Sequence, residues 1–192
     1  MCMLTDRAPR KPSLLAGFLE SDRNRTLAIP PDNRLGASAK SLEAALNAGA
    51  SADASQACRE FFSVAADFYK VPTPGIRVLA ARPLRSRESG WAYELFGDYD
   101  PRTGLIRVWM RTAVHKRVTS FGTFLSTLCH EFCHHLDYHS FGYGDSWHTR
   151  GFYERAAVLY HHSRGTPAKR LFWTKLPGGR WRIDWPRTNR GQ

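Results

Sequence analysis

Apolar residues recur at helical spacing in three segments of the chain. Residues 51–69, 120–139 and 148–160 each read as a helix, because positions three or four apart lie on one helix face. Ser120 stands at the start of the second segment, where its hydroxyl can cap the helix. The apolar face of that segment is made of Phe121, Phe124, Leu125, Leu128, Phe132 and Leu136. This helix is therefore expected to pack against a core.

Three shorter segments between the first two helices read as strands. Residues 76–81 are short and apolar, and residues 90–97 and 105–110 alternate apolar with polar positions. Turn-forming residues fill positions 98–104 between the last two, which predicts a hairpin.

The order of helix, three strands, helix and helix predicts an α+β core over residues 51–164. Residues 1–50 hold four prolines among charged and small residues. Short helical turns are expected there at 14–19 and 39–48, in an arm that is mobile or only loosely docked. Residues 165–192 form a separate tail, which reads as a β-hairpin with strands over 171–175 and 180–185.

The composition narrows the class of protein further. With 192 residues and 42% hydrophobic residues, the chain can bury one real core. Cys2, Cys58, Cys129 and Cys133 contain no C-x-x-C pair, which argues against a disulfide framework and a zinc ribbon. Cys129 and Cys133 are expected to be small buried residues. No apolar run approaches a membrane span and no secretory signal is evident, so a cytoplasmic protein with reduced thiols is expected.

The helix over 120–139 carries the motif H-E-x-x-H, formed by His130, Glu131 and His134. Residues four apart on a helix lie one turn above each other, so both imidazoles can face one metal ion. Glu131 is displaced around the helix and can reach a water on that ion. Two helical histidines, a third ligand and a glutamate base are the parts of a zinc hydrolase.

The third ligand has to come from elsewhere. The short-linker pattern of zinc proteases needs glycine and histidine where this chain has Asp137 and Ser140. The downstream candidates are His139, Asp145, His148, Glu154, His161 and His162. His139 would leave the metal face of the helix, whereas His148 stands at the start of the following helix and can swing back onto the ion. His148 is the favoured ligand and Glu154 the alternative.

H-E-x-x-H, a loop, and then His148 followed by Gly151 and Phe152 resemble the SprT-like family of zinc metallopeptidases. That family includes the Spartan proteases, which degrade proteins crosslinked to DNA. The resemblance covers about residues 52–164 and is strongest over 104–160. It implies a zincin-like core with one Zn²⁺ on His130, His134 and His148, and Glu131 as the catalytic base. By the same analogy residues 105–110 are a candidate substrate-binding edge, with an ordinary interior strand as the alternative.

The chain departs from the family in its tail, where many members carry a four-cysteine zinc ribbon. From Arg164 onward there are eight basic residues and one acid, Asp184, a net charge of +7 within the total of +11. Aromatic rings among cations can stack bases while the cations bind phosphates. The candidate nucleic-acid-binding residues are Lys169, Arg170, Trp173, Lys175, Arg180, Trp181, Arg182 and Trp185. The alternative is that the tryptophans pack on a neighbouring helix and the charges are solvated.

The sequence thus predicts a zinc metalloendopeptidase that acts on a protein or peptide, with DNA as a second partner and a cytoplasmic, nucleoid-associated location. Two other functions remain open: a non-catalytic zinc-stabilised nucleic-acid-binding module, and a regulatory peptidase with one dedicated protein substrate. Gating of the cleft by DNA or by the N-terminal arm is a further hypothesis. Tyr143, Tyr153 or Arg150 can supply the oxyanion donor, and Asp137 can either orient a ligand imidazole or face solvent.

Overall fold

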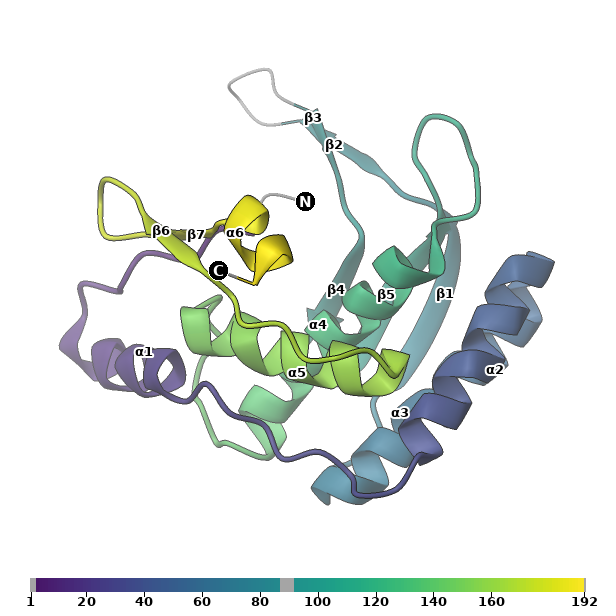
Figure 1. The fold of residues 1–192 in the computed structure, drawn as a ribbon, viewed down its shortest axis with the longest axis horizontal. Coiled ribbons are helices and arrows are strands. Elements are labelled where there is room, and N and C mark those ends of the chain that lie inside the picture. Colours follow the sequence, from purple (N-terminus) through teal and green to yellow (C-terminus); the bar gives the residue numbers. More distant parts are fainter. Residues whose placement is uncertain (1–2, 87–91, 192) are drawn as a thin grey trace.

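The structure is a computed structural model, and it describes residues 3–86 and 92–191. The helices in these ranges are α1 (Pro12–Arg23), α2 (Arg34–Ala48), α3 (Ser51–Tyr69), α4 (Phe121–His139), α5 (Arg150–Arg164) and α6 (Trp185–Arg190). The strands are β1 (Gly75–Ala81), β2 (Leu84–Ser86), β3 (Ala92–Glu94), β4 (Gly97–Asp100), β5 (Leu105–Arg111), β6 (Trp173–Lys175) and β7 (Trp181–Ile183). The predicted α+β class and the three predicted helices are confirmed (Figure 1).

The main sheet has the strand order β1-β5-β4. β1 runs parallel to β5, and β4 runs antiparallel to it. β5 is therefore the central strand, and its Ile106, Val108 and Met110 side chains are buried in the core. The analogy that made residues 105–110 a substrate-binding edge is wrong, because β4 is the outer strand on this side of the sheet.

The predicted hairpin is present, but its strand begins later than expected. β4 and β5 pair from Gly97 opposite Val108 to Asp100 opposite Leu105. Aspartate disfavours strands, yet Asp98 lies within β4 and accepts two hydrogen bonds from Arg107 of β5, at 2.6 and 2.8 Å. Residues 92–94 of the expected strand instead form β3, which pairs with β2. Positions 90 and 91 lie outside the described residues.

The helices pack around one core behind the sheet. In α3 and α4, the rings of Phe62 and Phe132 stack with centroids 5.5 Å apart, and both side chains are buried. α2 lies along α3, and α5 crosses α4 (Figure 1). This arrangement holds α4, which carries the H-E-x-x-H motif, between the sheet and α5.

The N-terminal 50 residues are more ordered than the sequence analysis expected. The two expected helical turns are the full helices α1 and α2, and Leu35, Leu42 and Leu46 of α2 are completely buried. α1 ends against the start of α5, where Asp22 forms an ion pair with Arg150. The prediction of a mobile or loosely docked arm is therefore wrong for these two helices. The apolar face of α2 is a structural part of the core.

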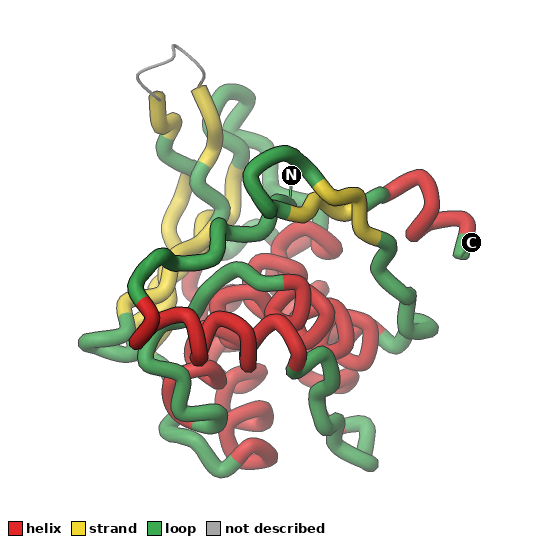
Figure 2. The backbone as a smooth tube through the Cα atoms, turned by 90° about the vertical axis from the view of Figure 1, so that its left-hand side faces the viewer, coloured by secondary structure: helices red, strands yellow, loops and turns green. Residues whose placement is uncertain are grey.

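The C-terminal tail contains the predicted hairpin, β6 and β7, followed by the unpredicted helix α6. The N-terminal segment runs beside this hairpin (Figure 2). The Thr5 amide donates to the Trp181 carbonyl at 2.8 Å, and the Ile183 amide donates to the Met3 carbonyl at 3.3 Å. We call residues 3–6 the N-terminal strap. The two ends of the described chain thus meet above α5.

Candidate metal centre

His130 and His134 are one turn apart on α4, and their ring centroids are 4.9 Å apart. Ser120 caps this helix by accepting a hydrogen bond from the Thr123 amide, as predicted. Burial, followed by the neighbouring His148, lowers the pKa of His130 to about 3. Burial also lowers the pKa of His134. Both imidazoles are therefore neutral at pH 7, the form that binds a metal ion.

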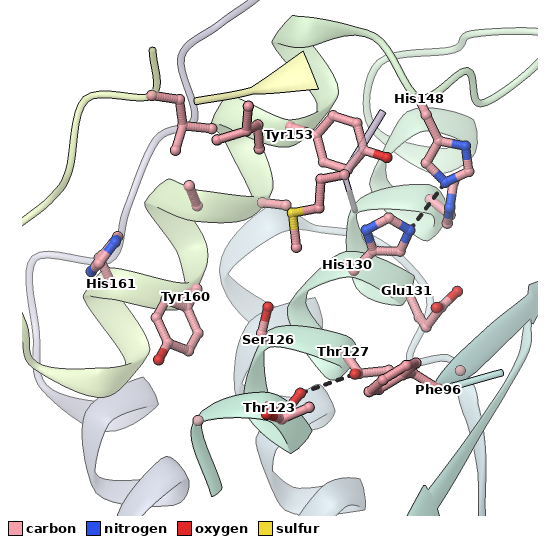
Figure 3. Close-up of a pocket in the computed structure, with 18 of the residues that line it drawn as sticks. Phe96, Thr123, Ser126, Thr127, His130, Glu131, His148, Tyr153, Tyr160 and His161 are labelled. Atoms are coloured by element: carbon pink, nitrogen blue, oxygen red, sulfur yellow. Dashed lines mark hydrogen bonds between the residues drawn. The ribbon is translucent and has the colours of Figure 1, made fainter. Parts of the chain in front are cut away.

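His148 reaches the same point from the loop between α4 and α5. Thr149 caps α5, because its side-chain oxygen accepts a hydrogen bond from the Phe152 amide at 3.0 Å. His148 directly precedes this cap and turns back towards α4. Its Nε2 lies 3.1 Å from the Nε2 of His130 (Figure 3).

One ligand atom from each of His130, His134 and His148 lies within 4.8 Å of the other two. Two nitrogens about 2.0–2.1 Å from a tetrahedral zinc ion are about 3.3 Å apart, so the 3.1 Å separation of the two Nε2 atoms fits such an ion. Three neutral imidazoles are also a usual donor set of catalytic zinc sites. The triad can therefore hold one metal ion.

Two of the other ligand candidates, Glu154 and His139, contact residues outside the triad. Glu154 accepts a hydrogen bond from the Trp173 indole at 2.9 Å and forms an ion pair with Arg25. The ring of His139 lies against His135, with centroids 4.3 Å apart. Cys129 and Cys133 are free thiols buried in the core, as expected for small packing residues.

A buried relay orients His134. Its Nδ1 lies 2.7 Å from the hydroxyl of Ser146, which donates to the Asp137 carboxylate at 2.7 Å. Asp137 is fully buried and receives a further hydrogen bond from Arg155 at 2.8 Å. Asp137 therefore acts on the ligand imidazole through Ser146 and does not face solvent, which answers the question that the sequence left open.

His148 is held by the N-terminal strap. The carboxylate of Asp6 accepts a hydrogen bond from the His148 amide at 2.9 Å, and its Oδ2 lies 3.3 Å from Nδ1 of the ring. The Asp6 amide in turn donates to the His148 carbonyl at 2.9 Å. A carboxylate on the outer nitrogen fixes the tautomer and the orientation of a ligand imidazole. Sequence reasoning missed Asp6, and its separation of 142 residues from His148 left no local signal.

Glu131 is 5% exposed and lies beside β4. A Cβ atom built on Gly97 would lie 2.8 Å from Oε1 of Glu131 and 2.6 Å from the Thr127 methyl group, so only glycine fits this close approach. Burial, followed by the charge of Asp98, raises the pKa of Glu131 to about 8. A cation held by the triad would act against this shift, because a nearby positive charge stabilises the carboxylate.

The triad and Glu131 open into one cavity of about 1190 Å³. Phe96, which precedes β4, and Gly97 of β4 line this cavity, together with residues of α4 and α5. Met3 of the strap and Ile183 and Trp185 of the tail also line it. In the view of Figure 3, Glu131 lies between His130 and Phe96. The cavity is therefore bounded by the edge of the main sheet on one side and by both chain ends on the other.

Among the three candidate oxyanion donors, only Tyr153 lines this cavity. Its ring centroid is 6.0 Å from that of His130 and 5.8 Å from that of His148. Tyr143 is buried and its hydroxyl accepts a hydrogen bond from Asn24, while Arg150 is paired with Asp22. The Tyr153 hydroxyl itself donates to the Leu4 carbonyl at 3.3 Å, so Tyr153 is favoured by its position in the cavity and not by a free hydroxyl.

The tail tryptophans are divided between packing and exposure. The Trp173 ring packs near Tyr153, with centroids 6.1 Å apart, and the Arg150 guanidinium lies 4.4 Å above the ring of Trp181. Trp185 is 39% exposed. The remaining candidate nucleic-acid-binding residues are the exposed Lys169, Arg170, Lys175 and Arg182 and the partly buried Arg180. Nucleic-acid binding by this set stays a prediction, and packing accounts for Trp173 and Trp181.

No family model, curated protein or solved structure matches the chain. None of the described helices has both the length and the apolar character needed to cross a bilayer.

Proposed function

We propose that this protein is a zinc-dependent metalloendopeptidase of the SprT-like type. The observation that supports it most is the convergence of three imidazoles and one buried carboxylate on a single cavity. A site that only stabilised the fold would need neither an open cavity nor Glu131 beside the ligands. This contrast favours the enzyme over a non-catalytic zinc module.

Each residue has a distinct part in the proposed reaction. His130, His134 and His148 hold the ion, which when bound supplies an acidified water and polarises the peptide carbonyl. Glu131 accepts a proton from the attacking water and passes it to the leaving amine. The relay through Ser146 and the carboxylate of Asp6 keep two of the imidazoles in their ligand tautomer.

The substrate is expected to bind as an extended segment beside β4. This strand is the outer one of its sheet, and residues 96–99 line the cavity next to Glu131. An outer strand offers backbone donors and acceptors to an added strand. Such pairing would bring a peptide carbonyl near the triad through backbone hydrogen bonds, so no particular side chain of the substrate would be required.

DNA association and a DNA-bound protein substrate are the finer part of the proposal. They are supported by the resemblance to the SprT-like family and by the net charge of +7 in the tail, where eight basic residues face one acid. A regulatory peptidase with one dedicated substrate shares the same metal chemistry and differs only in the breadth of its substrates.

The test is cleavage of a histone by the zinc-loaded protein, with and without single-stranded DNA. Glu131→Gln is the matched variant, because it keeps the size of the side chain and removes the base. We expect Glu131→Gln to bind zinc normally and to lose at least about 100-fold in rate. DNA should raise the rate of the wild-type protein.

The outcomes separate the parts of the proposal. Equal cleavage by wild type and Glu131→Gln would refute the mechanism. Cleavage that ignores DNA would keep the peptidase and remove the DNA association. Stoichiometric zinc with no cleavage of any protein would favour a dedicated substrate or a non-catalytic module.

A further inference from the structure

The cavity extends well beyond the metal triad. At its far end it is lined by Tyr160, His161 and Arg164 of α5, by Lys169 of the tail, and by Gly122 at the start of α4. We call this group the basic end. Figure 3 shows Tyr160 and His161 on the opposite side of the cavity from His148. The proposed catalytic chemistry uses none of these side chains.

The polar groups of the basic end converge. A Cβ atom built on Gly122 would lie 3.3 Å from Nη1 of Arg164 and 3.3 Å from the hydroxyl of Tyr160, so the two donors lie close together above the first turn of α4. The absence of a side chain at Gly122 leaves the space in front of them open. Lys169 adds an ammonium group, which donates to the Asn189 side chain at 3.1 Å.

None of the carboxylates in the described lining of the cavity belongs to the basic end. In the described lining the carboxylates are Glu94, Asp98 and Glu131, all on or beside the β4 side. Two of these are already neutralised, Glu94 by Arg82 and Asp98 by Arg107.

The environment of His161 shows the same excess of positive charge. Burial, followed by the charges of Lys169 and Arg164, lowers the pKa of His161. An anion that binds at the basic end would therefore contact Arg164 and Lys169, which are both positively charged. In the described lining of this end, no carboxylate of the protein competes with it.

The distance between the basic end and the metal triad limits which ligands can contact both. Gly122 precedes His130 by eight residues of α4. At a rise of about 1.5 Å per residue, this is about 12 Å. An extended peptide spans about 3.3–3.4 Å per residue, so three to four residues cover the same distance.

We propose that the basic end binds an acidic side chain of the substrate, three or four residues from the scissile bond. This inference rests on the proposed peptidase function and adds a substrate preference to it. A peptide is favoured over a nucleic acid because the basic end shares one cavity with Glu131 and with β4, whose backbone can pair with an extended chain. The guanidinium of Arg164 can bind a carboxylate through two parallel hydrogen bonds.

The experiment uses peptides taken from a cleaved protein substrate. At each position up to five residues from the scissile bond, on either side, aspartate or glutamate is compared with asparagine or glutamine. For wild type we expect kcat/KM to be about tenfold higher with the acid at one position three or four residues away, as is typical of a charge-assisted hydrogen bond. In Arg164→Gln/Lys169→Gln this ratio should fall close to one.

The control variant is Lys11→Gln/Lys40→Gln, which removes the same number of charges at exposed positions that do not line the cavity. It should keep the wild-type ratio. A ratio near one in wild type, or the same loss in both double variants, would overturn the proposal, because the effect would then be absent or due to net charge.

A binding measurement separates this proposal from the peptidase function. If no peptide is cleaved, the affinity of the zinc-loaded protein for acidic and amide peptides is compared by fluorescence anisotropy. Tighter binding of the acidic peptides, lost in Arg164→Gln/Lys169→Gln, would support the basic end although the peptidase had failed. Equal binding would overturn it. A double variant that loses affinity only for a single-stranded oligonucleotide would also overturn it, because the cations would then bind phosphates and not the substrate's carboxylate.

Discussion

Residues outside the triad decide which nitrogen of His134 and of His148 can face an ion. Nδ1 of His134 is bonded to Ser146, and Nδ1 of His148 is bonded to Asp6, so each leaves Nε2 for the metal. The Nε2 of His130 faces that of His148. The site thus presents three like nitrogens, and two of them are held in place before an ion arrives. Preorganisation of this kind raises metal affinity, because less ordering remains to be done on binding.

The identity of the third ligand can be tested with His148→Ala. Loss of one of three ligands should weaken zinc binding by more than about 100-fold, the upper end of what loss of an outer partner costs. The matched control is His139→Ala, since His139 lies on α4 but packs against His135 away from the ion. The measurement is competition with a chromophoric chelator. Weaker binding in His139→Ala than in His148→Ala would reassign the ligand.

Asp6→Ala tests whether the N-terminal strap is part of the metal centre. Loss of the carboxylate should lower zinc affinity by about 10–100-fold, because His148 would lose the partner that fixes its ring. Asp32→Ala is the control, since Asp32 is an exposed acid paired with Arg34 far from the triad. With Co²⁺ in place of zinc, the visible spectrum should change in Asp6→Ala and not in Asp32→Ala. An unchanged spectrum and affinity would leave Asp6 a purely structural role.

At the scale of single residues, the sequence pointed to the three histidines that could hold an ion but not to the residues that support them. His130 and His134 are visible because a helix brings positions four apart together, whatever the rest of the fold does. His148 was found because it stands at the start of the next predicted helix. Ser146 and Asp6 contact the ligands only after the loop and the strap have folded over α4, and no local pattern encodes such contacts. Their roles required the tertiary structure.

At the scale of elements, the site depends on how closely β4 approaches α4. Gly97 lies against Thr127 and Glu131 with no room for a Cβ atom. The sequence analysis placed the substrate edge one strand away, on β5, by analogy with the strand that precedes the metal helix in the family it resembles. Alternation reports that a strand has one buried face, but it does not report the order of the strands. The sequence pattern also gave no sign that Asp98 pairs with Arg107 across the strands, a contact that joins β4 to β5.

In α2, by contrast, the sequence analysis gave too little weight to a helical periodicity that was present. Leu35, Ala39, Leu42 and Leu46 follow the four-three-four spacing of one helix face, and all four are buried. The signal was present, but the prolines around it favoured a loose arm. Prolines before a helix mark its start and do not weaken its packing, as Pro12 at the first position of α1 also illustrates.

Gly97→Ala tests the contact between β4 and α4. The added methyl group would lie within 3 Å of both Thr127 and Glu131 and must displace the carboxylate. We expect peptide hydrolysis to fall by about 100-fold, as after a misplacement of about 1 Å, while zinc affinity stays close to that of wild type. Gly144→Ala is the control, because its Cβ would meet no atom within 4 Å and its backbone is unstrained. Equal activity of both variants would show that Glu131 tolerates the shift.

At the scale of the whole molecule, the metal centre joins the two ends of the chain. The strap bonds to β7 on one side and to His148 on the other, through the amides of Thr5 and Asp6. The Trp181 amide donates back to the Thr5 hydroxyl at 2.8 Å. The tail that carries most of the net charge is therefore connected to a ligand of the ion by two short steps. This connection supplies a physical route by which a partner bound to the tail can influence the site.

Amide hydrogen exchange can measure this coupling without any truncation. If the strap and β7 open only when the site opens, zinc at 100 times its Kd should stabilise them by about 2.7 kcal/mol. Exchange of the Thr5, Asp6, Trp181 and Ile183 amides should then slow by about 100-fold, together with the amides of α4. Among the described strands β2 pairs with β3 alone, so its amides should change much less.

Asp6→Ala provides the decisive comparison in the same experiment. With the carboxylate gone, zinc should still protect α4 but should protect β7 less than in wild type, because two of the three bonds between Asp6 and His148 are lost and only the bond from the Asp6 amide to the His148 carbonyl remains. Protection of β7 by zinc that is as strong in Asp6→Ala as in wild type would mean that the coupling does not run through the Asp6 carboxylate. If zinc protects only the amides of α4 in wild type, the tail is independent of the metal centre. Any effect of DNA on catalysis would then have to act directly at the cavity.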